Sequence, residues 1–293
     1  MLKVRARTTL LFVVAVAQPW LLAQDESNVR GITLTERILG DGGSVGLITK
    51  FDTAVGYRFN RYFAVEGGFP VYAINPSSTF ITTTGTHAQT GMGDAYVDVR
   101  LYLSNPAVNY YGVLTAAAPT GDRASGLSTG RPTFDWSNLF DRSFGPLMPF
   151  AELGIGNTIL DQAYFIRPFT SLGFVSHLEG GVSYKVFGPV SVGGSLYAIE
   201  PSGQQKVFSK LFGSTPGPGS GNGHPHHGVF ENPGETVGTA DITRDHGVSA
   251  WVGADPSKYV QIELGYSRSM DYSLDSVFFG VTFNLGSLIP IHR

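Results

Sequence analysis

The chain contains no cysteine, and charged residues make up only 15% of its 293 residues. The missing cysteine excludes disulfides, thiol catalysis and metal sites built on thiolates. The charged fraction is well below the roughly 25% that is typical of soluble domains. Acidic residues number 23 against 20 lysines and arginines, and the cations form no stripe, so we expect no binding to nucleic acid.

Long hydrophobic runs are also missing after residue 23, where no stretch of 18 apolar residues occurs. We therefore expect no membrane-spanning helix beyond that point. The chain has no convincing helical periodicity, no phosphate-binding loop of the Walker type and no dinucleotide fingerprint. These absences argue against nucleotide-dependent enzymes, and we expect no cofactor. The chain that remains consists of strands and loops.

The first 23 residues form a unit of their own. Lys3, Arg5 and Arg7 precede a short apolar run at residues 10–17, and small residues allow cleavage after Ala17 or after Ala23. This layout predicts a secretory signal peptide, because the run is too short to span a membrane; an uncleaved anchor helix is the alternative. Cleavage removes the three cations and changes the formal net charge from −3 to −6.

The segment GDAYVDVRLYL, residues 93–103, alternates apolar and polar residues without interruption. A period of two predicts a strand with one apolar face. Clear or weaker alternation elsewhere predicts eleven more strands, at residues 30–37, 50–59, 62–72, 110–119, 133–144, 149–157, 172–186, 190–199, 247–253, 259–267 and 277–285.

The connections between these strands alternate between short turns and long loops. With strands of about ten residues, this alternation is typical of bacterial outer-membrane barrels. Glycines at residues 40–43 supply an outer turn after the first strand. We predict a single-domain, all-β, antiparallel transmembrane β-barrel of about twelve strands over residues 24–293. A soluble β-sandwich, a lipocalin-type barrel or another soluble periplasmic β-protein is the alternative.

In a transmembrane barrel the apolar face meets lipid and the polar face lines the lumen. An acid excess in a narrow lumen predicts a preference for cations or neutral solutes. Arg100 is either free there or paired with an acid of a neighbouring strand, such as Glu66. The predicted lumen-lining residues are Lys50, Asp52, Arg58, Glu66, Asp94, Asp98, Arg100, Asp135, Asp141, Glu152, His177, Glu179, Lys185 and Glu263.

Residues 213–238 are rich in glycine, proline and histidine and contain little that can be buried. This composition predicts a flexible extracellular loop. His224, His226 and His227 within it are candidate ligands for a transition metal. We favour no metal site, because no carboxylate is fixed nearby and ordering a flexible loop opposes binding.

A lipid-modifying enzyme is a further alternative, and it would need a nucleophile beside a base. His177 is the histidine that we place in a strand, and its neighbour Ser176 points to the opposite face of that strand. We therefore favour a lumen histidine bonded to a carboxylate and expect no enzymatic activity.

Residues 278–285, FFGVTFNL, resemble the terminal β-signal of outer-membrane proteins. Gly280 is followed at the third and fifth positions by Phe283 and Leu285. The segment differs from the usual pattern in having Phe278 where a polar residue is common, and in the eight residues that follow it. The resemblance implies recognition by the barrel-assembly machinery and insertion among outer-membrane lipid.

A second set of motifs lies between Gly91 and Asn157. A Gly-x-Gly-Asp strand contains Gly91, Gly93 and Asp94, an apolar strand ends in Pro-Thr-Gly-Asp at residues 119–122, and a loop carries Thr129-Gly130. These motifs resemble the phenol-degradation meta-pathway family of outer-membrane proteins. The resemblance implies an outer-membrane channel or porin, for which hydrophobic or aromatic solutes have been suggested.

These observations predict a porin-like channel in the outer membrane of a Gram-negative-type bacterium, which admits small-molecule solutes by passive diffusion. The alternatives are a closed barrel with a structural or loop-mediated binding role, and a lipid-modifying enzyme.

Overall fold

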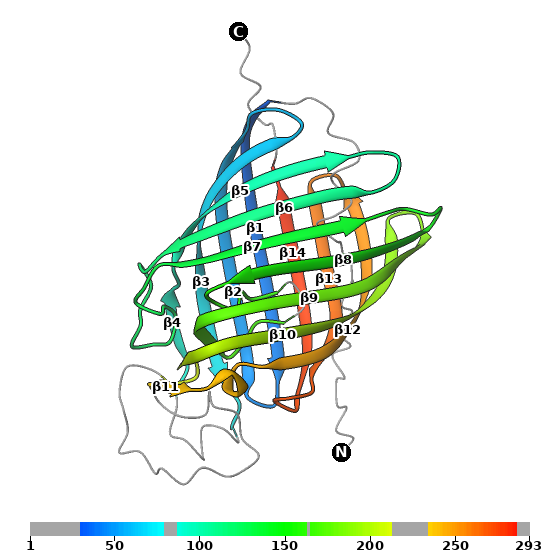
Figure 1. The fold of residues 1–293 in the computed structure, drawn as a ribbon. Helices are drawn as coiled ribbons and strands as arrows, with labels where there is room; N and C mark the ends of the chain where they lie inside the picture. Colours follow the sequence, from blue (N-terminus) through cyan, green and yellow to red (C-terminus); the bar gives the residue numbers. More distant parts are fainter. Residues whose placement is uncertain (1–29, 79–86, 163–164, 213–233, 286–293) are drawn as a thin grey trace, which may run out of the picture.

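The computed structural model describes residues 30–78, 87–162, 165–212 and 234–285. Within these residues, twelve antiparallel strands form the wall of a barrel (Figure 1). The prediction of an all-β barrel with twelve strands is confirmed. The wall consists of β1 (Gly31–Gly43), β2 (Gly46–Arg58), β3 (Phe63–Pro76), β5 (Ala95–Ser104), β6 (Asn109–Ala118), β7 (Thr133–Asp141), β8 (Leu147–Gly156), β9 (Phe169–Phe187), β10 (Val190–Ser209), β12 (Asp245–Ser257), β13 (Val260–Ser269) and β14 (Leu274–Asn284).

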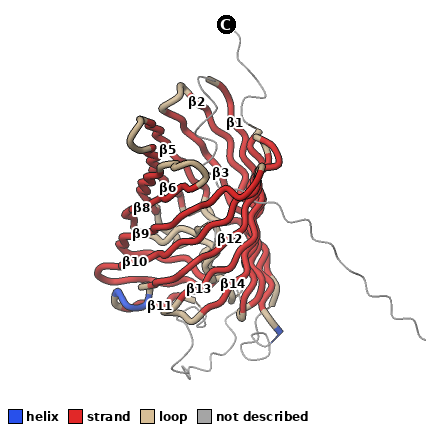
Figure 2. The backbone as a smooth tube through the Cα atoms, turned by 90° about the vertical axis from the view of Figure 1, so that its right-hand side faces the viewer, coloured by secondary structure: helices blue, strands red, loops and turns tan. Residues whose placement is uncertain are grey.

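Hydrogen bonding between the first and last strands closes the barrel. β1 pairs with β2 on one side and with β14 on the other, in a register that runs from Thr35 opposite Asn284 to Gly43 opposite Ser276. β10 pairs with both β9 and β12, which completes the ring of neighbours. The strands run obliquely around the barrel (Figure 2). Closure gives hydrogen-bond partners to the backbone N–H and C=O groups of the edge strands, which lipid cannot do.

The apolar face of the wall points outward. On β5, Val97 is 48% exposed, whereas its neighbour Asp98 is only 6% exposed. On β2, Phe51 and Val55 are exposed, whereas Asp52 between them is buried. Asp52 and Asp98 line an internal cavity. The barrel therefore presents hydrocarbon to its surroundings and charge to its interior, which is the arrangement of a barrel that lies in lipid.

The two ends of the barrel differ in their connections. At the short-turn end, strands are joined by residues 59–62, 105–108, 142–146, 188–189 and 258–259. At the long-loop end, residues 77–94, 119–132, 157–168 and 210–244 connect strands and include the short strands β4 (Gln89–Met92) and β11 (Glu235–Gly238) and a 3-10 turn, η3 (Ala240–Ile242). Two further connections at this end are short, residues 44–45 and 270–273, so the predicted alternation of loop lengths is present for four of its six connections.

Several strands are longer than the sequence predicts, and β1 and β10 are two examples. β1 continues through residues 40–43, which were expected to form the outer turn, because this segment pairs with both β2 and β14. β10 continues past Pro201 to Ser209, because β9 pairs with it along this extension. A register shift between Ser202 and Lys206 accommodates Gly203, whose φ is 73°.

Several predicted features lie outside the described residues. These are the signal peptide at residues 1–23 and the histidines His224, His226 and His227. The last residues of the predicted flexible loop are described, and Glu235–Gly238 form β11, which pairs with β10. The prediction of a flexible loop is therefore wrong for these four residues, since the edge of the extended β10 offers them backbone partners. No helix among the described residues is long and apolar enough to cross a membrane.

One loop at the long-loop end folds into the barrel. Residues 157–168, between β8 and β9, are called the inner loop here; they place Phe165 and Ile166 in a buried apolar cluster. The cluster fills the barrel interior near that end and leaves the other half to a polar cavity. Its buried members are Ile48, Tyr72, Ile74, Leu127, Phe165, Ile166, Phe169, Val207, Leu211 and Leu274.

Candidate functional site

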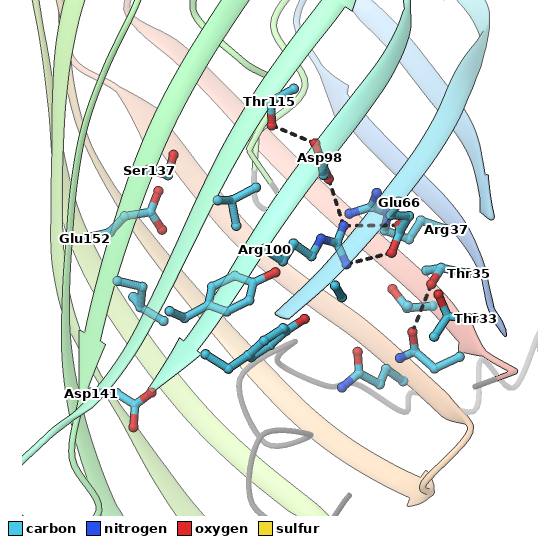
Figure 3. A pocket seen from close by; sticks show the side chains of 18 of the residues that line it. Thr33, Thr35, Arg37, Glu66, Asp98, Arg100, Thr115, Ser137, Asp141 and Glu152 are labelled. Carbon is cyan, nitrogen blue, oxygen red and sulfur yellow. Dashed lines mark hydrogen bonds and ion pairs between the residues drawn. The ribbon is translucent and has the colours of Figure 1, made fainter. Parts of the chain in front are cut away.

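A cavity of about 1040 Å³ occupies the barrel between the short-turn end and the inner loop. Its lining runs from Arg61 in a short turn to Asp161 in the inner loop. Figure 3 shows part of this lining, with Glu152 on one side and Arg37 and Arg100 on the other. A cavity of this size can enclose a drug-sized solute.

Arg100 is locked into the wall by two acids. Its guanidinium forms a fork with Glu66, with Nη1 2.8 Å from Oε2 and Nη2 3.1 Å from Oε1, and Nη2 also lies 2.8 Å from Asp98 Oδ2. Asp98 accepts a further bond of 2.7 Å from the Thr115 hydroxyl. Glu66 and Asp98 are direct cross-strand partners on β3 and β5, so a guanidinium between them cancels a like-charge repulsion. Of the two alternatives that the sequence leaves open for Arg100, the structure shows pairing with Glu66.

Arg37 forms a second cluster on the neighbouring strands. Its Nη2 lies 3.0 Å from Asp52 Oδ2 and donates a 2.9 Å hydrogen bond to the Tyr96 hydroxyl. Tyr96 in turn donates to Asp52 over 2.8 Å. The register places Arg37 on β1 directly opposite Asp52 on β2. The two arginine clusters therefore form a charge-compensated band across β1, β2, β3 and β5.

The cavity lining holds seven cationic and seven acidic residues. The predicted acid excess is therefore wrong for the lining as a whole, because the prediction did not include Arg61, Arg142 and Lys258 near the turns. These three, with Arg58, lie at the short-turn rim, so the deeper lining keeps an excess of acids. The full charged set is Arg37, Lys50, Arg58, Arg61, Arg100, Arg142 and Lys258, and Asp52, Glu66, Asp98, Asp141, Glu152, Asp161 and Glu263.

The structure separates the predicted lumen residues into groups. Those on the cavity surface are Lys50, Asp52, Arg58, Glu66, Asp98, Arg100, Asp141, Glu152 and Glu263. The remaining five are not part of the cavity surface; they are Asp94, Asp135, His177, Glu179 and Lys185.

His177 bonds to a carboxylate rather than to a serine. Its Nε2 lies 2.9 Å from Asp135 Oδ2, and its Nδ1 lies 4.0 Å from Glu152 Oε1. Glu179 on β9 is the cross-strand partner of Glu152 on β8. Lys185 is exposed near the short-turn end. The expectation that His177 is bonded to a carboxylate is confirmed.

Asp94 holds a loop instead of lining the cavity. Its Oδ1 accepts a 2.9 Å hydrogen bond from the Gly121 amide, and the neighbouring Thr120 hydroxyl accepts a 2.8 Å bond from the Ala95 amide. A Cβ added at Gly121 would lie 2.7 Å from the Gly93 carbonyl carbon, so only glycine permits this approach. The Gly-x-Gly-Asp and Pro-Thr-Gly-Asp motifs thus hydrogen-bond the connection before β5 to the connection after β6. The second of these connections places Leu127 in the buried cluster.

Of the charged residues that hold the inner loop, sequence reasoning singled out Lys50 and missed the others. The Asp161 carboxylate lies 3.0 Å from Lys210 Nζ and 3.5 Å from Lys50 Nζ. It also accepts a 2.7 Å hydrogen bond from the Tyr72 hydroxyl. Burial favours the neutral acid, but the two ammonium groups outweigh it and hold the pKa of Asp161 below its ordinary value. This carboxylate therefore stays charged at the boundary between the cavity and the inner loop.

Arg167 anchors the other end of the inner loop. Its Nη1 lies 2.8 Å from Asp245 Oδ2, and both side chains are 0% exposed. Asp245 also accepts bonds from Tyr197 at 3.0 Å and Ser269 at 2.5 Å. The anchor joins the inner loop to β12 across 78 positions of sequence, and no local pattern could have revealed it.

Comparison with known proteins finds no matching family model and no matching curated protein. Among solved structures, the chain is similar to the COG4313 outer membrane channel from Pseudomonas putida F1, with 9% identity and a TM-score of 0.54 over 92% of this chain and 100% of that one. It is also similar to the KdgM porin in complex with disordered oligogalacturonate and to the NanC porin, each at 9% identity and a TM-score of 0.46. These two matches cover 86% of this chain and 98% and 100% of theirs. At such identities the likeness concerns the fold alone, which is a closed antiparallel β-barrel.

Proposed function

We propose that this protein is an outer-membrane channel through which small solutes diffuse passively. The observation that supports this proposal is a closed barrel with an apolar outer surface and an internal cavity of about 1040 Å³ that is lined by charged residues. Diffusion through such a lumen needs no energy source, and selectivity comes from size and field. The deeper acid excess favours cations and neutral solutes over anions.

The proposal includes the route to the membrane. The signal peptide at residues 1–23 directs export, and the short-turn end then faces the periplasm. Gly280, Phe283 and Leu285 form the signal for the assembly machinery. Gly280 and Phe283 belong to β14, the strand that closes the barrel. We also propose kinship with the phenol-degradation meta-pathway family, on the motifs that clip residues 119–122 to Asp94.

The solute class suggested by that resemblance finds support in the cavity lining. Five tyrosines line the cavity, and aromatic rings offer flat, weakly polar surfaces to hydrophobic or aromatic solutes. The lining tyrosines are Tyr62, Tyr96, Tyr102, Tyr110 and Tyr111. We propose no catalytic role, because His177 is occupied by Asp135 and the described contacts place no serine beside it.

A closed barrel is the second candidate, and the inner loop favours it. Phe165 and Ile166 fill the interior at the long-loop end, and the buried pair of Arg167 and Asp245 holds them there. A barrel filled in this way would serve as a structural protein or as a support for binding loops.

Conductance separates the two candidates. Purified protein in planar bilayers should conduct in KCl, with a reversal potential under a salt gradient that indicates cation preference. The absence of conductance in correctly folded protein, verified by heat-dependent gel migration, would favour the closed barrel. Phospholipid turnover in detergent would contradict both.

A further inference from the structure

Glu263 differs from most of the other acids of the cavity in lacking a compensating charge. It is 6% exposed and lines the cavity, and its Oε1 accepts no hydrogen bond from any described residue. By contrast, Asp52 is paired with Arg37, and Asp161 with Lys50 and Lys210. A buried carboxylate without a partner is costly, so this group is either protonated or completed by a cation from the cavity that it lines.

The neighbouring strands place no side chain directly opposite this carboxylate. Its cross-strand partners are Gly253 on β12 and Gly280 on β14, neither of which has a side chain. Gly280 lines the cavity, and a Cβ placed there would lie 3.9 Å from Glu263 Oε2. The Ser191 hydroxyl fills the space at Gly253 and also lacks a partner among the described residues. At Gly280 the Leu39 side chain also approaches, 3.1 Å from such a Cβ, so the open side of the acid is the cavity itself.

We propose that Glu263 is a subsite of the lumen for the protonated amine of a small organic solute. An ammonium group has three donors and is suited to one carboxylate together with neutral acceptors. Gln261 and Thr282, which are cross-strand partners on the same wall, line the cavity next to this acid. This inference rests on the proposed channel function and names a solute class for it.

The surroundings favour an amine over a metal ion. Divalent cations take six or more oxygen ligands, whereas the carboxylates near this position are those of Glu263 and Asp255. Among the described residues, no group of three histidine, cysteine, aspartate or glutamate side chains is placed to hold a metal. The tyrosine rings of the cavity add attraction for an organic cation through their faces. Glu263 lies three residues from Val260, where β13 begins, and thus deeper than the cationic rim.

Calorimetric titration of the folded protein in detergent tests the subsite without requiring conduction. The probes are n-butylammonium, 1-butanol and butyrate, which have nearly the same size and differ in charge. At pH 7 we expect butylammonium to bind at least tenfold more tightly than the other two. Glu263→Gln keeps the shape and removes the charge, and should weaken butylammonium binding at least tenfold.

Glu36→Gln serves as the matched control, because Glu36 accepts a bond from Thr53 and is not part of the cavity lining. It should leave the affinity unchanged. If Glu263→Gln does not fold, Glu263→Asp shortens the side chain while keeping the charge and should give intermediate affinity. Equal binding of the three probes, unchanged binding in the Glu263 variants, or displacement by equimolar potassium would overturn the proposal. Bound amine in a protein that does not conduct would contradict the channel but not the subsite.

Discussion

At the scale of single residues, the ion pairs of this barrel differ in burial and therefore in how much the loss of one partner destabilises the protein. Arg167 and Asp245 are both 0% exposed, whereas Arg244 lies at the surface with Glu200 and Asp241. Removing one partner of a buried pair leaves an uncompensated charge, whereas an exposed pair contributes little.

We therefore expect Arg167→Met to release the inner loop. Undocking should be favoured by about 3–5 kcal/mol, because Asp245 is left charged and buried. Single-channel conductance should rise, and residues 157–168 should become sensitive to protease. Arg244→Met is the control and should change neither measurement; unchanged conductance and protease resistance in Arg167→Met would contradict the anchoring role.

The charge on Asp161 predicts how docking of the inner loop depends on pH. Its pKa is lower in the folded protein than in an undocked loop, despite burial, because Lys210 and Lys50 stabilise the anion. The stabilisation that this charge gives to the docked loop is complete above the undocked pKa of about 3.9. It is lost as the pH falls through the lower, folded pKa. Protease resistance of the inner loop should decline below pH 4 as this charge is lost.

Asp161→Asn is the matching variant for this prediction. Without the charge, the inner loop should be less protected at neutral pH, and the decline in acid should be smaller. A wild-type protein that loses protection between pH 7 and 6 would assign docking to another group.

At the scale of elements, the hydrogen bond between Asp94 and the Gly121 amide holds two loops together. Asp94 and Gly121 join the connection before β5 to the one after β6. Asp94→Ala should destabilise this loop by about 1.5–3 kcal/mol, the usual worth of a hydrogen bond to a charged group. Limited proteolysis at residues 119–132 measures the effect. Asp94→Asn retains an acceptor oxygen but loses the charge, and should lie between the wild type and Asp94→Ala.

The elements also divide into those that the sequence predicts and those that it does not. Strands such as β5 follow from a period of two, because lipid and lumen impose opposite polarity on successive residues. The inner loop has no such period: Phe165 and Ile166 are apolar residues in a connection, and their partners come from distant strands. The subsite at Glu263 was predicted as lumen-lining, but its lack of a partner depends on contacts that only the structure supplies.

At the scale of the whole molecule, the lumen field is the sum of paired and unpaired charges. Arg100→Met removes one cation and leaves Glu66 and Asp98 opposite each other without compensation. The cation-to-anion permeability ratio should rise severalfold, measured as a shift in reversal potential under a KCl gradient. Thr115→Val, which removes a neutral bond to Asp98, should leave the ratio nearly unchanged.

The pairing of β1 with β14 also determines when the chain can fold. Thr35 bonds across the closing seam to Asn284, so the last contacts of the wall join the two extremes of the described chain. Contacts between such distant positions make folding slow, because the intervening chain must be ordered first. Until the last strand is in place, β1 and β13 both present open edges that lipid cannot satisfy. A half-formed wall therefore leaves two strand edges unpaired in lipid, and we expect closure of the barrel and its insertion to occur together.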